Sequence, residues 1–209
     1  MKITVFGASS PSGRVLVEKA LEQGHELTAF VRDRSKLALP HARLNIIEGD
    51  ALNAAQVDAA VQGSEAVISF LGPKRGAPKN MTTQATQNIL NALTKHGVRR
   101  LVITSVGGIA VPGEQRSGVA KVVDALIKLL ARDVYLDREQ QLALLFNSPL
   151  DWVAVRLPRL TDEPATGSYQ VGNLKVGPSL KISRADLADF MLKQLTDNTY
   201  LRQAPIISN

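Results

Sequence analysis

The sequence predicts an α/β fold, with a mainly parallel sheet of six or seven strands and helices on both faces. Two observations predict it. Along nearly the whole chain of 209 residues, short apolar segments alternate with longer segments whose apolar residues recur at helical spacing. The short segments are continuously apolar rather than alternating, as expected of strands covered on both sides. No linker, repeat or low-complexity stretch interrupts this order, so we expect one domain over residues 1–209.

The first half of the chain begins with a strand at residues 2–6. The first helix is expected at 13–23, where Val17, Ala20 and Leu21 share a face and Gly24 stops the helix. Further strands are expected at 26–31, 43–47 and 65–71, and further helices at 53–61 and 82–96.

The second half continues with strands at 100–104 and 151–157. Ser183 and Asp186 form a capping box that starts a last helix, ending near residue 195. The remaining expected elements are a helical region at 118–146 interrupted near Asp133, an irregular excursion at 161–182 along the ligand-binding edge of the sheet, and a short strand at 204–207.

Composition restricts the functional classes. The formal net charge is +6, but aromatic residues make up only 4% of the chain, too few for a base-stacking platform, so we expect no nucleic-acid partner. No apolar run reaches the roughly 18 residues of a membrane helix, and the first residues do not resemble a signal peptide. We therefore expect a cytoplasmic protein without a membrane partner. Cysteine is absent and the three histidines are scattered, so no metal site is expected.

The turn after the first strand carries the first functional signal. It reads GASSPSG and lies between a strand and a helix, which is the context of a dinucleotide-binding loop. Gly7 permits the tight turn, and Gly13 lets the helix approach the strand closely. Backbone N–H groups at the helix N-terminus can then hold a pyrophosphate.

Ser10 stands in this loop where a glycine is usual. Its side chain could open the loop slightly and weaken phosphate binding. Alternatively, the hydroxyls of Ser9, Ser10 and Ser12 could donate hydrogen bonds to the phosphate oxygens. The second interpretation is favoured because Pro11 stiffens the loop and the serines are small.

The end of the second strand favours NADP over NAD. An acidic residue there would bind the ribose hydroxyls of NAD, whereas an arginine accommodates the 2′-phosphate of NADP. Arg32 comes first after the apolar run, followed by Arg34 and Lys36. Arg14 could add to these cations, and Asp33 keeps NAD as the alternative cofactor.

Seven stretches together resemble the atypical short-chain dehydrogenase/reductase family. The resemblance is to the group that contains biliverdin reductase B, an NADPH-dependent flavin reductase, and the NmrA-like NAD(P)H-binding proteins. It covers nearly all of the chain in order, although the family's central loop glycine is replaced by Ser10. The stretches are GASSPSG, ELTAFVRDRSKL, EGDAL, AVISFLGP, KHGVRRLVITS, LDWVAVRLPRLTDEPATGSY and ISRADLADFMLKQL.

The resemblance implies a Rossmann-like domain that binds NADPH along the carboxyl edge of the sheet, with Arg32 and Lys36 at the 2′-phosphate. Arg138 stands where the reductase carries a histidine near its substrate, and Arg156 and Arg159 also depart from the reductase. By the same resemblance, Gly7, Ser9, Ser10, Ser12 and Gly13 would line the pyrophosphate, Asp50 and Ala51 the adenine, Leu71 and Gly72 the ribose, Thr104 and Ser105 the nicotinamide and substrate, and Leu157, Pro158, Arg159 and Leu160 the wall behind the nicotinamide.

Most short-chain reductases use a tyrosine acid with a lysine four residues later. Here Tyr135 is followed at that spacing by Glu139, and neither Tyr169 nor Tyr200 has such a lysine. A carbonyl reduction with a tyrosine acid, or a sugar-nucleotide epimerisation, is therefore disfavoured.

A flavin, quinone or linear tetrapyrrole can accept a hydride directly and take its proton from water. We therefore expect an NADPH-dependent oxidoreductase acting on a flat conjugated acceptor, with Ser105 and Arg138 as candidate catalytic residues. The alternative is a non-catalytic NADP(H)-binding redox sensor of the NmrA-like type, which the same residues fit.

The acceptor is expected to be planar and anionic, because cations lie near the predicted edge of the sheet. The chain is compatible with a monomer or a homodimer, and the apolar residues Val122, Val123, Leu126, Leu129 and Leu130 are expected in the core rather than at an interface. The cations are Lys74, Arg75, Lys79, Arg116 and Arg138.

Overall fold

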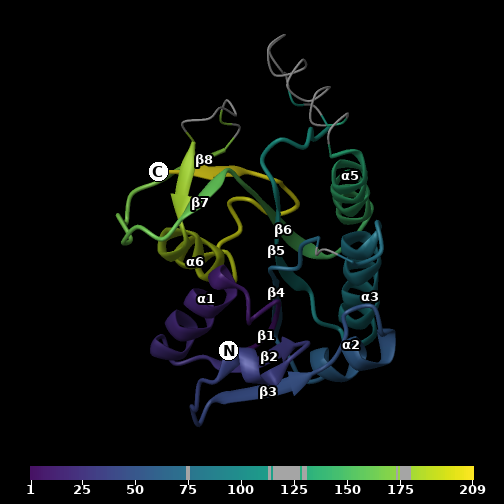
Figure 1. Ribbon diagram of the computed structural model, residues 1–209, viewed down its shortest axis with the longest axis vertical. Coiled ribbons are helices and arrows are strands. Elements are labelled where there is room, and N and C mark those ends of the chain that lie inside the picture. The colour runs from purple at the N-terminus through teal and green to yellow at the C-terminus, as the bar shows by residue number, and fades with distance from the viewer. Residues whose placement is uncertain (74–75, 113, 115–127, 129–130, 173, 175–179) are drawn as a thin grey trace.

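Strands and helices alternate along the chain in the computed structural model (Figure 1). The structure describes residues 1–73, 76–112, 114, 128, 131–172, 174 and 180–209. The elements up to the middle of the chain are β1 (Lys2–Phe6), α1 (Pro11–Glu22), β2 (Glu26–Val31), the 3-10 helix η1 (Arg34–Leu37), β3 (Leu44–Glu48), α2 (Ala54–Val61), β4 (Ala66–Ser69) and α3 (Met81–Lys95). They are followed by β5 (Arg100–Val106), α5 (Arg132–Phe146), β6 (Asp151–Leu157), β7 (Arg159–Thr161), β8 (Gln170–Gly172), β9 (Lys181–Ser183), α6 (Arg184–Lys193) and β10 (Ile206–Ser208).

The central sheet has eight strands in the order β3-β2-β1-β4-β5-β6-β10-β8. All neighbours are parallel except β8, which runs antiparallel to β10. The predicted α/β class with a mainly parallel sheet is confirmed. The sheet exceeds the expected six or seven strands because β8 joins its edge.

The segment 161–182 is more ordered than its composition suggests. It was expected to be irregular, but it contains β8 and the start of β9, and β9 pairs in parallel with β7 in a separate two-stranded sheet. Strands of three residues are too short to show a hydrophobic period, so the sequence pattern could not reveal them.

The expected helical region at 118–146 is described only in part. α5 begins at Arg132, one residue before the interruption that was expected near Asp133. Residues 118–127, 129 and 130, which include the five apolar residues Val122, Val123, Leu126, Leu129 and Leu130, lie outside the described residues.

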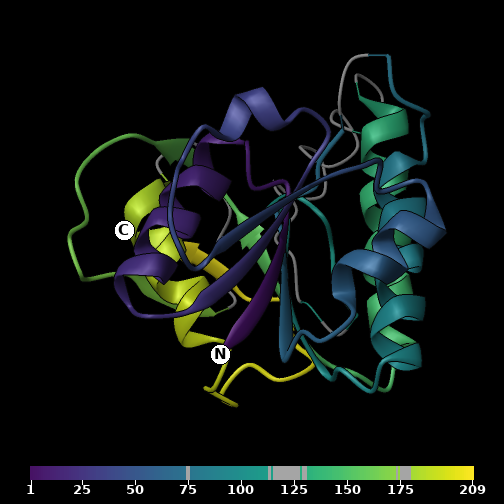
Figure 2. The same cartoon turned by 90° about the horizontal axis from the view of Figure 1, so that it is seen from below.

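Two helical layers cover the sheet (Figure 2). α1 and α6 pack together on one face, and α2, α3 and α5 cover the other. Successive strand residues point to opposite faces. Ile3 and Val5 of β1 belong to the hydrophobic core under α1 and α6, whereas Phe6 belongs to the core under α2, α3 and α5. The strands therefore have to be apolar on both sides, which explains their continuously apolar sequences.

Helix ends follow local chemistry that the sequence displays. Gly24 follows α1 with a φ of +86°, a conformation that favours glycine, and the Asn53 side chain caps α2. α3 is capped from another helix instead, since the Asp137 carboxylate of α5 accepts hydrogen bonds from the N–H groups of Thr82 and Thr83 at 3.0 and 2.8 Å. This contact ties α5 to the start of α3.

Asp186 is the buried hub of the C-terminal region. As predicted, Ser183 caps α6 by accepting a hydrogen bond from the Asp186 N–H at 3.0 Å. The fully buried Asp186 carboxylate in turn accepts bonds from the N–H groups of Thr166 and Gly167 and from Asn209 Nδ2. Burial alone would raise the pKa of Asp186, but these hydrogen bonds and that of Ser183 lower it overall.

None of the helices in the part of the chain that the structure describes is both long and apolar enough to cross a bilayer.

Asp186→Asn should lower the free energy of unfolding by about 1.5–3 kcal/mol at neutral pH, because an amide replaces a carboxylate that accepts several buried hydrogen bonds. Urea unfolding measures this difference. The folded-state pKa of Asp186 is lowered, so its stabilisation is complete above the unfolded pKa of about 3.9 and is lost as the pH falls through the folded value. The gap between wild type and variant should therefore close in acid.

Asp162→Asn is the matched control for this variant. Asp162 pairs with Arg184 at 2.6 Å, but its side chain is 87% exposed, so its removal should change stability by less than about 1 kcal/mol. Equal losses for the two variants would contradict the role of Asp186 as a hub.

Candidate cofactor site

A pocket of about 330 Å³ opens beyond the carboxyl ends of β1, β2 and β4. β1 pairs with β2 on one side and β4 on the other, so the connections from these strands diverge and leave a crevice, where ligands bind in open α/β sheets. The residues predicted from the sequence that line it are Gly7, Ser9, Ser10, Arg32, Asp50, Ala51, Leu71 and Gly72.

The glycine loop needs both of its glycines. Gly7 has a φ of +74°, and a Cβ there would lie 3.1 Å from the backbone carbon of Phe70. A Cβ on Gly13 would lie only 2.3 Å from the Gly7 carbonyl oxygen. α1 therefore starts in direct contact with the end of β1, as the sequence predicted. Gly13 itself lies beneath the loop and does not line the pocket.

Ser10 is the N-cap of α1. Its Oγ accepts a hydrogen bond from the Gly13 N–H at 3.0 Å, and its own N–H donates to the Gly7 carbonyl at 3.0 Å. The serine in the glycine position thus stabilises the helix start, a role that was not predicted. The signal was in the sequence, because a serine followed by proline at the first helical position is typical of a helix N-terminus.

The first turn of α1 has few N–H groups left for a ligand. Pro11 has none, the Gly13 N–H is capped, and the Arg14 N–H bonds the Ser10 carbonyl at 2.9 Å. The Ser12 N–H remains in this turn, although the Ser12 side chain is buried and does not line the pocket.

The end of β2 presents Arg32 to the pocket, and the Arg32 side chain is exposed. Asp33 points elsewhere: its carboxylate caps η1, accepting from the Ser35 N–H at 3.1 Å, and lies 3.4 Å from Lys36 Nζ. The hydrogen bond from Ser35 holds the pKa of Asp33 below its usual value. Lys36 does not line the pocket, and neither does Arg14, whose guanidinium bonds two backbone carbonyls.

The turn after β3, which was predicted to border the adenine, is held by hydrogen bonds between side chains and backbone. Asp50 Oδ1 accepts from the Leu52 N–H at 3.0 Å, and the Asp50 N–H donates to Gln56 Oε1 at 2.8 Å. Asn88 of α3 holds the Ala51 carbonyl at 2.9 Å. The apolar walls were not predicted, because they come from residues that the sequence pattern assigns to strands and turns: Phe30, Val31, Gly49, Phe70, Pro73 and Met81.

Ser105 lies near the carboxyl end of β5, next to Thr104. Leu101 and Ile103 of this strand face α2, α3 and α5, so Ser105 faces the same side. Ser105 is 2% exposed, and its Oγ has no hydrogen-bond partner among the described residues. A buried hydroxyl without a partner is costly, which makes it a candidate for a ligand contact.

Arg138 of α5 joins the ends of two strands. Its Nη1 donates to the Thr104 carbonyl at 3.3 Å and to Gln141 Oε1 at 2.9 Å, and its Nη2 donates to the Leu71 carbonyl at 3.2 Å. Burial lowers the pKa of Arg138 to about 10, against the opposing effect of Asp137, so the side chain stays charged at neutral pH. The guanidinium also lies 2.9 Å from the position of a Cβ on Gly72, so a side chain there would require the end of Arg138 to shift.

The predicted nicotinamide wall lies outside the pocket. None of the four residues Leu157–Leu160 lines it, and the Arg159 side chain is exposed. The start of this segment is joined to the end of β5 by a backbone hydrogen bond, in which the Gly107 N–H donates to the Leu157 carbonyl at 2.9 Å.

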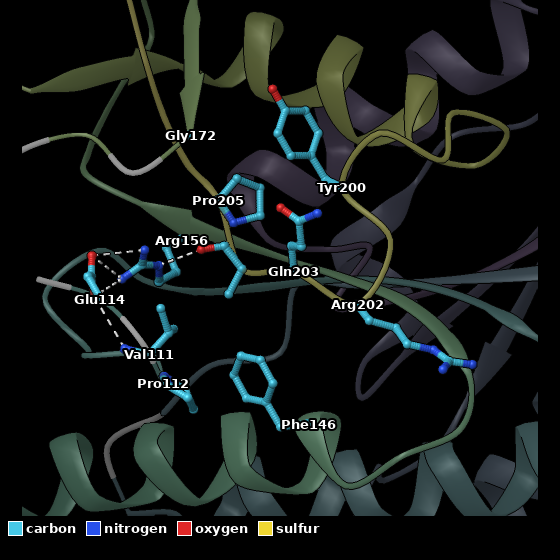
Figure 3. Close-up of a pocket in the computed structure, with 11 residues that line it drawn as sticks. Val111, Pro112, Glu114, Phe146, Arg156, Gly172, Tyr200, Arg202, Gln203 and Pro205 are labelled. Carbon is cyan, nitrogen blue, oxygen red and sulfur yellow. Dashed lines mark hydrogen bonds and ion pairs between the residues drawn. The ribbon is translucent and has the colours of Figure 1, made fainter.

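Arg156 lies beside a second pocket of about 260 Å³ (Figure 3). Its guanidinium pairs with the Glu114 carboxylate at 3.0 Å and donates to the carbonyls of Ala204 and Ile109 at 2.7 and 2.9 Å. Both side chains of the ion pair are at least 95% buried, with exposures of 2% and 5%. Arg156 thus holds the loop after β5 against the sheet.

Of the remaining predicted cations, only Lys79 lies among the residues that the structure describes. Lys79 pairs with Asp133 at 2.9 Å, whereas Lys74, Arg75 and Arg116 lie outside the described residues. Tyr135 is 3% exposed within the core under α3 and α5. Within the ranges that the structure covers, no three histidine or carboxylate side chains gather as a metal site would require.

Comparison with known proteins decides the family. Residues 7–198 match the NAD(P)H-binding family. The chain belongs to this family. This chain is 30% identical over 126 residues to a 3-beta-hydroxysteroid dehydrogenase of Mycolicibacterium neoaurum and 26% identical over 202 residues to YwnB of Bacillus subtilis. The YwnB match covers 93% of this chain and 92% of YwnB.

Other curated relatives are longer. The dehydrogenase match covers 54% of this chain but 34% of that protein. An uncharacterized protein of Mycobacterium tuberculosis is 34% identical over 107 residues, which are 51% of this chain and 12% of that protein. The chain therefore spans about a third or less of these two relatives.

Solved structures share the fold of this NAD(P)H-binding protein. A short-chain dehydrogenase/reductase of Veillonella parvula in complex with NADP superposes with a TM-score of 0.81 at 21% identity, covering 100% of this chain and 94% of that one. ChuY of Escherichia coli O157:H7, an anaerobillin reductase, superposes with a TM-score of 0.78 at 20% identity, covering 100% and 97%. The predicted Rossmann-like architecture is confirmed.

Gly13→Ala should destabilise the fold and abolish measurable nucleotide binding, because the new Cβ would lie 2.3 Å from the Gly7 carbonyl oxygen and would push α1 away from β1. Thermal unfolding and nucleotide titration by calorimetry measure the two effects. Gly63→Ala is the control: a Cβ there meets nothing within 4 Å, so only its φ of +77° costs stability, about 1 kcal/mol, and nucleotide binding should be kept. Unchanged binding in Gly13→Ala would contradict the loop assignment.

Proposed function

We propose that this member of the NAD(P)H-binding family is an NADPH-dependent oxidoreductase that reduces a flat conjugated acceptor, such as a flavin, quinone or linear tetrapyrrole, without a tyrosine–lysine acid pair. The observation that carries the proposal is the buried Ser105 hydroxyl without a partner, placed at the carboxyl end of β5 beside strand ends that Arg138 holds. NADPH, when bound, supplies the hydride for this reduction.

The pocket residues fit such a cofactor. The glycine loop and the Ser12 N–H would form a cradle for the pyrophosphate, and a Cβ on Gly7 or Gly13 would distort this loop by its contact with Phe70 or with the Gly7 carbonyl. Asp50 and Ala51 would border the adenine. The side chain that we assign to the 2′-phosphate is Arg32, because it lines the pocket while the carboxylate of Asp33 is held by η1. NAD is the weaker alternative for the same reason.

The acceptor would lie against Ser105 and the strand ends. The Ser105 hydroxyl can donate a hydrogen bond to an acceptor oxygen or nitrogen and so fix its orientation. Arg138 is a buried cation without an ion-pair partner among the described residues, since its guanidinium bonds carbonyls and Gln141. Its field stabilises negative charge that develops on an acceptor, which fits an anionic one. The proton that completes the reduction comes from water.

The ChuY likeness supports the tetrapyrrole among these acceptors, and the Veillonella parvula complex supports NADP as the cofactor. Both proteins share the whole fold with this chain at 20% and 21% identity, so the support is for the class of reaction. The competing interpretation, an NmrA-like sensor that binds NADP(H) without turnover, requires the same cofactor contacts and differs only in the absence of acceptor reduction.

Arg32→Ala should weaken NADPH binding by about 1–3 kcal/mol and leave NADH binding nearly unchanged, because a charged hydrogen bond to the 2′-phosphate is lost. Calorimetric titration with both nucleotides measures this. Arg34→Ala is the control, since Arg34 is an exposed residue of η1 that does not line the pocket. Equal losses for both nucleotides would exclude Arg32 as the phosphate ligand.

Purified protein mixed with NADPH should oxidise it when FMN, menadione, dichlorophenolindophenol or biliverdin is added, as followed at the nicotinamide absorbance band. Ser105→Ala should lower kcat/KM for the best acceptor about tenfold, as expected for one lost hydrogen bond, with NADPH affinity retained. The control is Ser64→Ala, which removes a hydroxyl 2.7 Å from Thr4 Oγ1, on the turn before β4. Tight NADPH binding without turnover on any acceptor would favour the sensor.

A further inference from the structure

Arg14 of α1 joins the glycine loop, which lines the cofactor pocket, to the 3-10 helix η1 that follows β2. Its Nε donates to the Ser9 carbonyl at 3.3 Å, and its Nη2 donates to the Lys36 carbonyl. Ser9 belongs to the glycine loop, and Lys36 belongs to η1, which follows β2. One side chain therefore links two segments that are 27 residues apart in the sequence, since Ser9 lies 5 residues before Arg14 and Lys36 lies 22 residues after it.

This arrangement differs from that of a phosphate ligand. Arg14 does not line the pocket, whereas Ser9, Ser10 and Arg32 do. Two of its donor nitrogens bond backbone carbonyls, one of Ser9, which lines the pocket, and one of Lys36, which does not, so the guanidinium holds backbone segments rather than the contents of the pocket.

The two carbonyls that Arg14 bonds belong to the two segments of the proposed site, the glycine loop and η1 after Arg32. Ser9 and Ser10 form the wall at the pyrophosphate, and Arg32 immediately precedes the residue that caps η1. Asp33 holds the first turn of η1 through the Ser35 N–H, and Arg14 holds its last turn through the Lys36 carbonyl. The backbone on which Arg32 stands is thus fixed relative to the glycine loop.

We propose that Arg14 is a positioning residue that determines the preference for NADPH over NADH, by holding the Arg32 segment at the distance from the glycine loop that a 2′-phosphorylated adenosine requires. The proposal rests on the proposed NADPH function. Its physical basis is preorganisation: a wall that is already in place loses less conformational freedom when the ligand binds.

An arginine suits this role better than a lysine. The planar guanidinium presents donors in a fixed fork, so it can bond two carbonyls at once and fix the angle between them. A lysine ammonium at the same place would keep the charge but would bond the carbonyls as a flexible point. Charge and positioning can therefore be separated by substitution.

The test is a double-mutant cycle measured by calorimetric titration with NADPH and NADH. Arg14→Ala and Arg14→Lys should each lower the ratio of NADPH to NADH affinity about tenfold, because the Arg32 segment is released. In the Arg32→Ala background, Arg14→Ala should leave that ratio unchanged, because no phosphate contact remains to be positioned.

Arg43→Ala is the matched control. Arg43 also bonds a backbone carbonyl of α1, through Nη2 to the Leu21 carbonyl at 2.9 Å, but at the other end of the helix and outside the pocket. It should change neither affinity. Thermal unfolding of each variant verifies that the fold is intact, and the lysine variant keeps the test available if Arg14→Ala fails to fold.

Three results would overturn the proposal. An unchanged affinity ratio in both Arg14 variants would remove the role, and so would equal losses for NADPH and NADH. Full rescue by lysine, with additive effects of Arg14→Ala and Arg32→Ala, would make Arg14 a direct phosphate ligand instead. These outcomes differ from failure of the proposed function, which would appear as wild-type protein that binds neither nucleotide or as Arg32→Ala without effect on NADPH.

Discussion

The close contact between the start of α1 and the end of β1 is the constraint on which the rest of the site depends. With Gly13 directly against the Gly7 carbonyl, the helix N-terminus lies at the mouth of the crevice between β1 and β4. Ser10 can then cap the helix through the Gly13 N–H. Any side chain at Gly13 would separate helix and strand, so the shape of the glycine loop, the helix cap and the packing of α1 on the sheet are one feature.

The order of elements followed from the sequence because a parallel sheet buried on both faces needs apolar strands, and the switch from strands to helical periods is visible in the residues. That the glycine loop, Arg32 and Asp50 meet at one pocket was predictable for the same reason: they occupy fixed places after the first three strands. β8 was not, because a three-residue strand has no period, and the walls formed by Phe30, Phe70 and Met81 depend on packing that spacing does not reveal.

Three arginines have hydrogen-bond partners that the sequence did not predict. A cation near a predicted ligand edge suggests an anion, yet Arg14, Arg138 and Arg156 all donate to backbone carbonyls. Parallel strands and helices end in carbonyls that have no partner in the next element, and a guanidinium has five N–H donors with which to satisfy several of them. Each arginine therefore ties together chain segments that the sequence alone leaves unconnected.

These ties divide the site into a part fixed by backbone and a part left open for ligand. Arg138 holds the carbonyls of Leu71, which follows β4, and of Thr104, near the end of β5, while the neighbouring Ser105 hydroxyl has no partner among the described residues. The Ser105 Oγ is one of several buried polar side-chain atoms without a hydrogen-bond partner among the described residues, and such a hydroxyl is costly unless a ligand completes it. Tyr135 of α5 is buried in the core, and Glu139 stands where a lysine would follow it, so the proposed reduction relies on orientation and charge rather than on a tyrosine acid.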